Sequence, residues 1–166
     1  MTEEFVDAST FLGMNSADEH ERRVCAGFFA ARLDGELGIS AEQVGICDDT
    51  IWRFGRQEQD DYYPFMDNLH SRLRFDRLTF TEADLAAALG DGRPELPMTD
   101  RLTLAMAVNH GATLYTLNPR LLALPGAPVR HPEADPLPRQ DFPEWLEQLY
   151  QASLVLRVDA AEVPAA

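Results

Sequence analysis

The fold is decided most clearly by residues 99–118, which read TDRLTLAMAVNHGATLYTLN. We expect a helix from Asp100 to about His110, with Thr99 as its N-cap. A glycine follows, and residues 112–116 then form a short, almost wholly apolar strand. A helix followed directly by an apolar strand is typical of a parallel sheet that is covered on both faces.

Strands and helices alternate on either side of this stretch. The expected strands are residues 4–8, 44–47, 77–80, 112–116 and, more weakly, 127–130. The other expected helices are a helix capped by Ser16 or Asp18 that runs to about Leu33, a helix capped by Asp48, and helices over residues 60–74, 81–89 (capped by Thr81) and 144–156. Residues 35–43 are expected to be a connection or a brief helix. This alternation predicts a single α/β sandwich domain.

The composition excludes several classes of function. All 14 basic residues are arginine, against 28 acidic residues, and the net charge is −14. Without lysine there is no Schiff-base chemistry and no phosphate-loop lysine. The acidity disfavours both a broad basic surface for nucleic acid and attraction to an anionic membrane.

The location of the protein is predicted from what the chain does not contain. No apolar run approaches the roughly 18 residues that a membrane helix needs, and residues 1–5 do not resemble a signal peptide. Two cysteines, Cys25 and Cys47, are too few for a disulfide framework, so we expect buried free thiols. These observations predict a cytoplasmic protein.

Oxygen-bearing side chains follow several of the predicted strands. Asp7 ends the first strand, Asp48 and Asp49 follow the second, and Asn118 follows the fourth. Asp100 lies in the first turn of a helix. Sites in parallel α/β sheets form beyond the carboxyl ends of the strands, and oxygen ligands suit Mg²⁺ or Mn²⁺.

Helix capping is the competing interpretation of these acids. Asp48, Asp49 and Asp100 lie where carboxylates are favoured for capping and dipole reasons alone. Asp7, at the end of an apolar strand, has no expected capping role, and a buried carboxylate is costly unless it is paired or bound to metal. Asp7 is therefore the strongest functional candidate.

Two segments resemble the PIN-domain family. Residues 5–10, FVDAST, are similar to the family's first strand, with its metal-binding Asp followed by a hydroxyl residue. Residues 96–121 resemble its pattern of an Asp that opens a helix, an Ala-rich face, a Gly and a strand ending in Thr-x-Asp. The resemblance covers about residues 4–131.

The resemblance implies a Rossmann-like, three-layer α/β/α sandwich with a central, mainly parallel sheet. It also implies three or four acidic residues that bind one or two Mg²⁺ or Mn²⁺ ions and hydrolyse a phosphodiester, usually in RNA. Many relatives are toxins with antitoxin partners, and homodimers are common. The catalytic candidates are Asp7, Asp49 and Asp100; the metal ligands are these three with Asn118; the substrate-binding candidates are Ser9, Thr10, Arg53 and Thr116.

The sequence departs from the family pattern at two acids. The second acid, a Glu one to two turns into the helix after strand two, falls near Arg53, with Asp49 as a substitute one turn earlier. The fourth acid is Asn118, which keeps an oxygen but loses the charge, so we expect Mg²⁺ or Mn²⁺ to be weakly bound. Arg53 is also placed to pair with Asp7 or Asp100 and occupy the position of the metal.

Three functions therefore stay open. The first is a metal-dependent phosphodiester hydrolase, with RNA as the expected substrate. The second is a degenerate PIN-like protein without nuclease activity that serves as a binding or regulatory module. The third is a metal-dependent hydrolase of a small molecule, which suits the acidic surface better.

The domain organisation follows from the same resemblance. Residues 1–131 are expected to form the PIN-like domain, and residues 132–156 a proline-rich connection and a helix packed on it. Residues 157–166 are expected to be a flexible tail. The aromatic residues near Tyr62 and Tyr63 are expected to be core or dimer contacts.

Overall fold

The computed structural model describes residues 2–160 and contains a five-stranded parallel sheet. The elements in chain order are β1 (Glu4–Val6), α1 (Ala8–Gly13), α2 (Glu19–Ala30), β2 (Glu36–Ser40), α3 (Ala41–Trp52), α4 (Arg56–Arg72), β3 (Arg74–Leu78), α5 (Glu82–Gly90), α6 (Met98–Asn109), β4 (Thr113–Tyr115), α7 (Pro119–Leu122), β5 (Val129–Arg130), the 3-10 helix η1 (Pro132–Ala134) and α8 (Glu144–Ser153). The strand order is β3-β2-β1-β4-β5.

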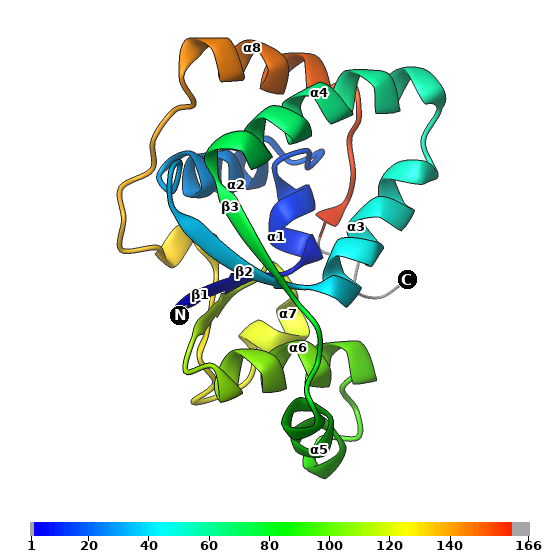
Figure 1. The fold of residues 1–166 in the computed structure, drawn as a ribbon, viewed down its shortest axis with the longest axis vertical. Coiled ribbons are helices and arrows are strands. Elements are labelled where there is room, and N and C mark those ends of the chain that lie inside the picture. The colour runs from blue at the N-terminus through cyan, green and yellow to red at the C-terminus, as the bar shows by residue number, and fades with distance from the viewer. Residues whose placement is uncertain (1, 161–166) are drawn as a thin grey trace.

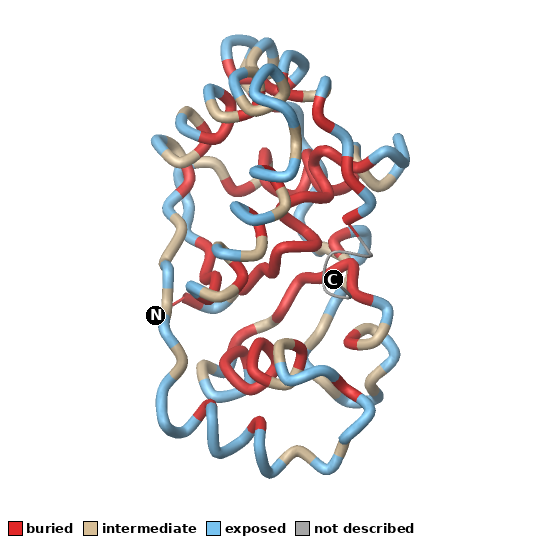
Figure 2. Tube along the Cα trace, turned by 90° about the vertical axis from the view of Figure 1, so that its right-hand side faces the viewer, coloured by how far each residue is buried: buried red, intermediate tan, exposed pale blue. Residues whose placement is uncertain are grey.

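Helices cover both faces of the sheet, which confirms the predicted α/β/α sandwich. Helices α1–α4 and α8 lie on one side, and α5–α7 lie on the other (Figure 1). Neighbouring strand residues point to opposite sides: Val6 and Tyr115 join the core under α2 and α4, whereas Phe5 and Leu114 join the core under α6. Figure 2 shows the buried trace concentrated in the interior of the molecule.

The first strand is shorter than expected, and this changes the role of Asp7. The strand ends at Val6, and Asp7 is the N-cap of α1, with its side chain accepting a hydrogen bond from the Thr10 amide at 3.2 Å. The expectation that Asp7 has no capping role is therefore wrong. A sharp entry into α1 replaces the last two residues of the predicted strand.

The second strand and the helix after it were predicted in the wrong place. Residues 44–47 lie inside α3, whereas β2 occupies residues 36–40, where a connection or brief helix was expected. The residues of α3 that are buried, Gln43, Cys47 and Ile51, recur every four positions, which is the spacing of one helix face.

The start of α3 also corrects the predicted cap. Ser40 caps this helix by accepting a hydrogen bond from the Gln43 amide at 3.1 Å, so Asp48 is not a cap. Strand β2 was not predicted, because Gly38 interrupts the apolar residues of this strand. A Cβ at Gly38 would lie 2.8 Å from the Phe5 ring of β1, so the close packing of these strands needs a glycine.

Two further element ends differ from the sequence prediction. The third strand begins at Arg74 and ends at Leu78, three residues earlier than the expected start at Arg77. Helix α6 begins at Met98 after Pro97 and has no side-chain cap, so Thr99 is not its cap. Thr81 caps α5 through a reciprocal capping box with Asp84, as predicted.

The C-terminal segment belongs to the main core. The rings of Phe142 and Tyr150 contact Phe65 of α4, and the Tyr150 hydroxyl donates a 2.7 Å hydrogen bond to the carbonyl of Met14. Val158 is buried and forms a parallel bridge with Ser16. Residues 157–160 of the predicted tail thus include two buried side chains, Val158 and Ala160, and residues 161–166 lie outside the described residues.

A buried arginine ties η1 to the sheet. Arg32, at the end of α2, is 5% exposed and pairs with Glu4 at 2.7 Å and Asp135 at 2.6 Å. Its guanidinium carbon lies 3.7 Å from the centre of the Phe28 ring. Two carboxylates and an aromatic face thus compensate the burial of one cation.

Two compositional predictions concern the cysteines and the membrane. Cys25 and Cys47 are buried free thiols, as expected, and burial raises the pKa of both. None of the helices in residues 2–160 combines the length and apolar content needed to cross a bilayer.

Candidate functional site

Asp7 lies at the carboxyl end of β1 with both oxygens hydrogen-bonded. The Ser9 hydroxyl donates to Oδ1 at 2.6 Å, the Thr10 amide donates to the same oxygen, and the Thr116 hydroxyl donates to Oδ2. The side chain is almost fully buried. Burial raises the pKa of Asp7, the three hydrogen bonds oppose this shift, and the charge of Asp100 adds to it.

The predicted substrate-binding hydroxyls join the end of β1 to the end of β4. Ser9 accepts from the Leu117 amide at 2.9 Å, and Thr10 donates to the Tyr115 carbonyl at 2.9 Å. Thr116 also accepts from the Asn118 amide at 2.9 Å. Because all three are buried, these groups hold two strand ends together and present no free donor to solvent.

Asp100 is paired with an arginine that the sequence analysis did not single out. Arg120 Nε donates to Asp100 Oδ2 at 2.7 Å, and the Asp100 side chain is 3% exposed. The Oδ1 atom of Asn118 accepts from the Arg120 amide at 3.0 Å and so caps α7. Asp7, Asp100 and Asn118 are thus gathered at one edge of the sheet, and we call this group, with Arg120, the carboxylate centre.

Asp49 and Arg53 are not part of the carboxylate centre. They form an ion pair with each other, four residues apart on α3, and both side chains are more than 60% exposed. Arg53 therefore pairs with neither Asp7 nor Asp100. The residue that reaches the centre from α3 is Gln43, whose Oε1 accepts from the Ala8 amide at 2.9 Å and whose Nε2 donates to Thr103 at 3.3 Å.

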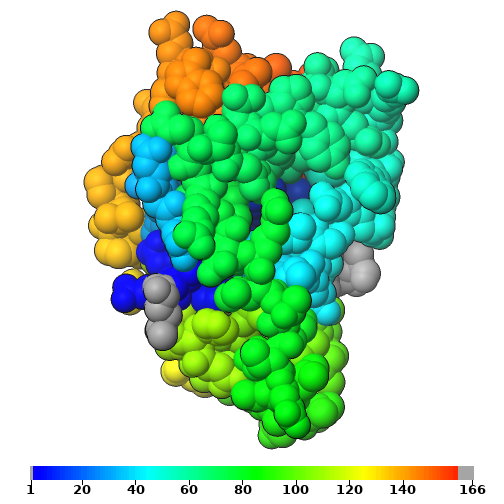
Figure 3. Space-filling view, in the orientation of Figure 1, coloured from blue at the N-terminus to red at the C-terminus, as the bar shows by residue number. Residues whose placement is uncertain are grey.

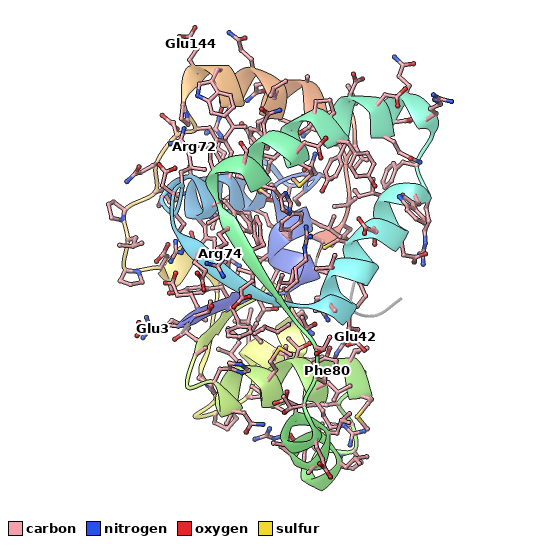
Figure 4. All side chains as sticks on the ribbon, in the orientation of Figure 1. Glu3, Glu42, Arg72, Arg74, Phe80 and Glu144 are labelled. Carbon is pink, nitrogen blue, oxygen red and sulfur yellow. The ribbon has the colours of Figure 1, made fainter. Side chains whose placement is uncertain are left out.

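Glu42 is a second residue that the sequence analysis missed. Its Oε1 atom is buried without a hydrogen-bond partner among the described residues, and burial raises the pKa of its carboxyl group. Figure 4 places Glu42 at the start of α3. The Ser40-x-x-Gln43 capping pattern was the sequence signal for this helix start.

The side chains do not fit a metal centre as they are arranged. Asp7 accepts three hydrogen bonds, Asp100 faces a guanidinium, and the amide oxygen of Asn118 is used as a cap. Within residues 2–160, no three His, Cys, Asp or Glu side chains are grouped so that they could hold a metal ion. Hard cations need several free anionic oxygens, and the centre offers internal donors instead.

The fold and its centre define a class: a parallel α/β/α protein with two buried carboxylates, Asp7 after β1 and Asp100 in the first turn of α6. The chain belongs to DUF6190, a family of unknown function whose pattern matches residues 1–163. No curated protein matches the sequence.

Proposed function

We propose that this protein is a PIN-like binding or regulatory module rather than a metal-dependent nuclease. The observation that carries the proposal is the 2.7 Å ion pair between Arg120 and Asp100, beside a carboxylate, Asp7, whose oxygens are satisfied by the protein itself. Arg120 takes the position that the sequence analysis considered for Arg53. A cation that neutralises Asp100 removes the need for a metal ion there.

The hydroxyl bonds around Asp7 support the same function. They link the ends of β1 and β4, which lie side by side in the sheet. A group in this position stabilises the fold whether or not a ligand is present. The acid cluster that the PIN resemblance implies is then retained as a structural centre.

Manganese binding and RNA cleavage test this proposal together. We expect millimolar MnCl₂ to leave the melting temperature unchanged and RNA to stay intact, in the wild type and in Asp100→Asn alike. A ligand that binds only the folded state raises the melting temperature, so metal binding would be visible without any activity. Asp49→Asn is the matched control, since it removes an exposed acid outside the carboxylate centre.

The opposite result would identify a hydrolase. An increase in melting temperature with Mn²⁺, together with RNA cleavage, both lost in Asp100→Asn but kept in Asp49→Asn, would overturn the proposal.

One observation favours the phosphodiester hydrolase as a second candidate. Glu42 brings a buried, unpartnered carboxylate oxygen to the first turn of the helix after β2. The PIN resemblance implies an acid one to two turns into that helix. Glu42 lies in the first turn, but its buried, unpartnered oxygen makes it a better candidate than Asp49, which is exposed and paired with Arg53. In this case Glu42→Gln and Asp100→Asn should both abolish cleavage of RNA.

The partners and location follow from the resemblance and composition. We propose a cytoplasmic homodimer whose partner is RNA or a protein of the antitoxin type. Sedimentation of the purified chain checks the dimer, and a monomer at all concentrations would contradict it.

A further inference from the structure

A cavity of about 400 Å³ opens between α3, α4 and the β3 edge of the sheet. This volume lies within the range of small-molecule sites in proteins. Figure 3 shows the hollow between β3 and α3, with dark blue atoms of the N-terminal region at its floor. We call it the aromatic cavity, and the acids and hydroxyls of the carboxylate centre do not line it.

Aromatic rings form much of the wall. Phe11, His70 and Phe75 pack against one another, with ring centres 5.4 Å apart for Phe11 and Phe75 and 4.6 Å apart for His70 and Phe75. Tyr62 and Tyr63 line the cavity from α4, with their rings edge to face. Such walls suit an apolar body, and ring faces also attract cations.

Two carboxylates lie beside these rings without partners. Asp48 on α3 and Asp67 on α4 line the cavity, and neither makes a hydrogen bond or ion pair through its side chain within residues 2–160. Three exposed arginines pair with an acid on their own helix, as Arg53 does with Asp49. Helices α3 and α4 therefore each place one negative charge beside the cavity. Neither charge is neutralised by a direct contact within residues 2–160.

The polar groups inside the cavity accept hydrogen bonds as well. Tyr62 is 2% exposed and makes no side-chain hydrogen bond within residues 2–160, and its oxygen is not one of the fully buried atoms that lack a partner, so the hydroxyl is open to the cavity. Burial lowers the pKa of His70, which favours the neutral ring. Because Nδ1 donates to the Met66 carbonyl at 2.7 Å, the neutral ring has Nε2 as an acceptor. The Tyr62 hydroxyl and His70 Nε2 are therefore available to a ligand in the cavity.

We propose that the aromatic cavity binds a small organic amine that has an apolar, aromatic-sized body and a protonated nitrogen. The body packs against Phe11, Phe75 and Tyr63, and the ammonium group lies near Asp48 and Asp67. The Tyr62 hydroxyl accepts one of its hydrogen bonds. Arg77 is the one arginine among the described residues that line the cavity. Its positive charge repels the amine, so removing this charge should strengthen amine binding.

Three probes of similar shape test the charge of the ligand. Isothermal titration calorimetry of the full chain compares 2-phenylethylamine, 2-phenylethanol and 3-phenylpropionate. We expect saturable binding of the amine, weaker binding of the alcohol and none of the carboxylate. Equal or tighter binding of the alcohol or the carboxylate, or no binding of the amine at millimolar concentration, would overturn the proposal.

Variants locate the binding site. Asp48→Asn and Asp67→Asn should each weaken amine binding about fivefold, as expected for the loss of one partly exposed ion pair. Tyr62→Phe should weaken it while keeping the ring, and Arg77→Gln should strengthen it. The matched control is Asp49→Asn, the neighbouring acid on α3, which does not line the cavity and should leave binding unchanged.

A steric variant separates the cavity from the rest of the surface. Val44→Phe places a ring in the cavity and should abolish binding, and circular dichroism of each variant checks that it is folded. Retained binding in a folded Val44→Phe protein would contradict the proposed site. These results do not depend on Mn²⁺ or RNA, so this proposal and the proposed function can fail separately.

Discussion

The carboxylate centre and the aromatic cavity both contain pairs of acidic side chains, but their acids have opposite surroundings. Asp7 and Asp100 are buried and meet internal donors or a guanidinium. Asp48 and Asp67 lie beside an open cavity and make no direct bond with the described chain. Acids that the protein satisfies itself contribute to the fold, whereas acids left unpaired beside a cavity are available to a ligand.

The largest expected effect is the loss of the Asp7 side chain. Asp7→Ala leaves the Ser9 and Thr116 hydroxyls without their acceptor, so the free energy of unfolding should fall by about 3 kcal/mol. The matched variant Asp48→Ala, in the aromatic cavity, should change it by less than about 0.5 kcal/mol. Urea denaturation measures both, and equal effects would remove the distinction between the two regions.

Breaking the ion pair of the carboxylate centre should have a smaller effect. Arg120→Leu leaves Asp100 buried and unpaired, and the cost should be about 1–2 kcal/mol, because the arginine is about one third exposed. In an Asp100→Asn background the same substitution should cost much less. If the losses of unfolding free energy in the two single variants add up to the loss in the double variant, Arg120 and Asp100 do not stabilise each other.

The pH dependence of stability tests the burial of Asp7. Its pKa in the folded protein is raised above the usual 3.8, so the folded state binds the proton more tightly than the unfolded state. The stability that Asp7 contributes is therefore fully present below pH 3.8, the pKa of the unfolded chain. This stability is lost as the pH rises through the pKa of the folded protein. Asp7→Asn cannot ionise, so the stability of the wild type relative to Asp7→Asn should decrease from pH 4 to pH 7.

Melting temperatures of both proteins across this range measure the difference. Because the two chains share all other titrating groups, their contributions cancel in the comparison. A difference that grows with pH would mean that the hydrogen bonds to Asp7 outweigh its burial.

The smallest effect is expected for the exposed ion pair on α3. Asp49→Ala removes the partner of Arg53, and both side chains are mostly in solvent. The free energy of unfolding should change by less than about 0.5 kcal/mol. A loss as large as that of Asp7→Ala would place Asp49 in a structural role that its surroundings do not indicate.

The α/β architecture could be predicted because several helices and strands have clear hydrophobic patterns in the sequence. Helix α6 and strand β4 were predicted within two residues at each end. Strand β2 was missed, since Gly38 interrupts its apolar run to make room for the Phe5 ring. The apolar run at residues 44–47 was assigned to a strand although it lies on a helix, because short apolar runs fit both structures.

The site was less predictable because its pairings join distant parts of the chain. Asp7 and Asp100 were identified by their positions relative to strands, and both lie in the carboxylate centre. Asp49 was assigned to the site because a strand was predicted at residues 44–47, directly before it, where the structure has helix α3. The pairing of Arg120 with Asp100 depends on how α7 turns back toward α6, and no spacing in the sequence encodes that contact.

The position of Val158 has a consequence for protein synthesis. Val158 pairs with Ser16, and the Tyr150 hydroxyl bonds the Met14 carbonyl, so the segment that follows α1 needs partners that the ribosome adds about 140 positions later. At ordinary rates of translation this segment waits on the order of ten seconds for these partners. The nascent chain therefore completes the packing around Met14 late, and this segment is a target for chaperones in the meantime.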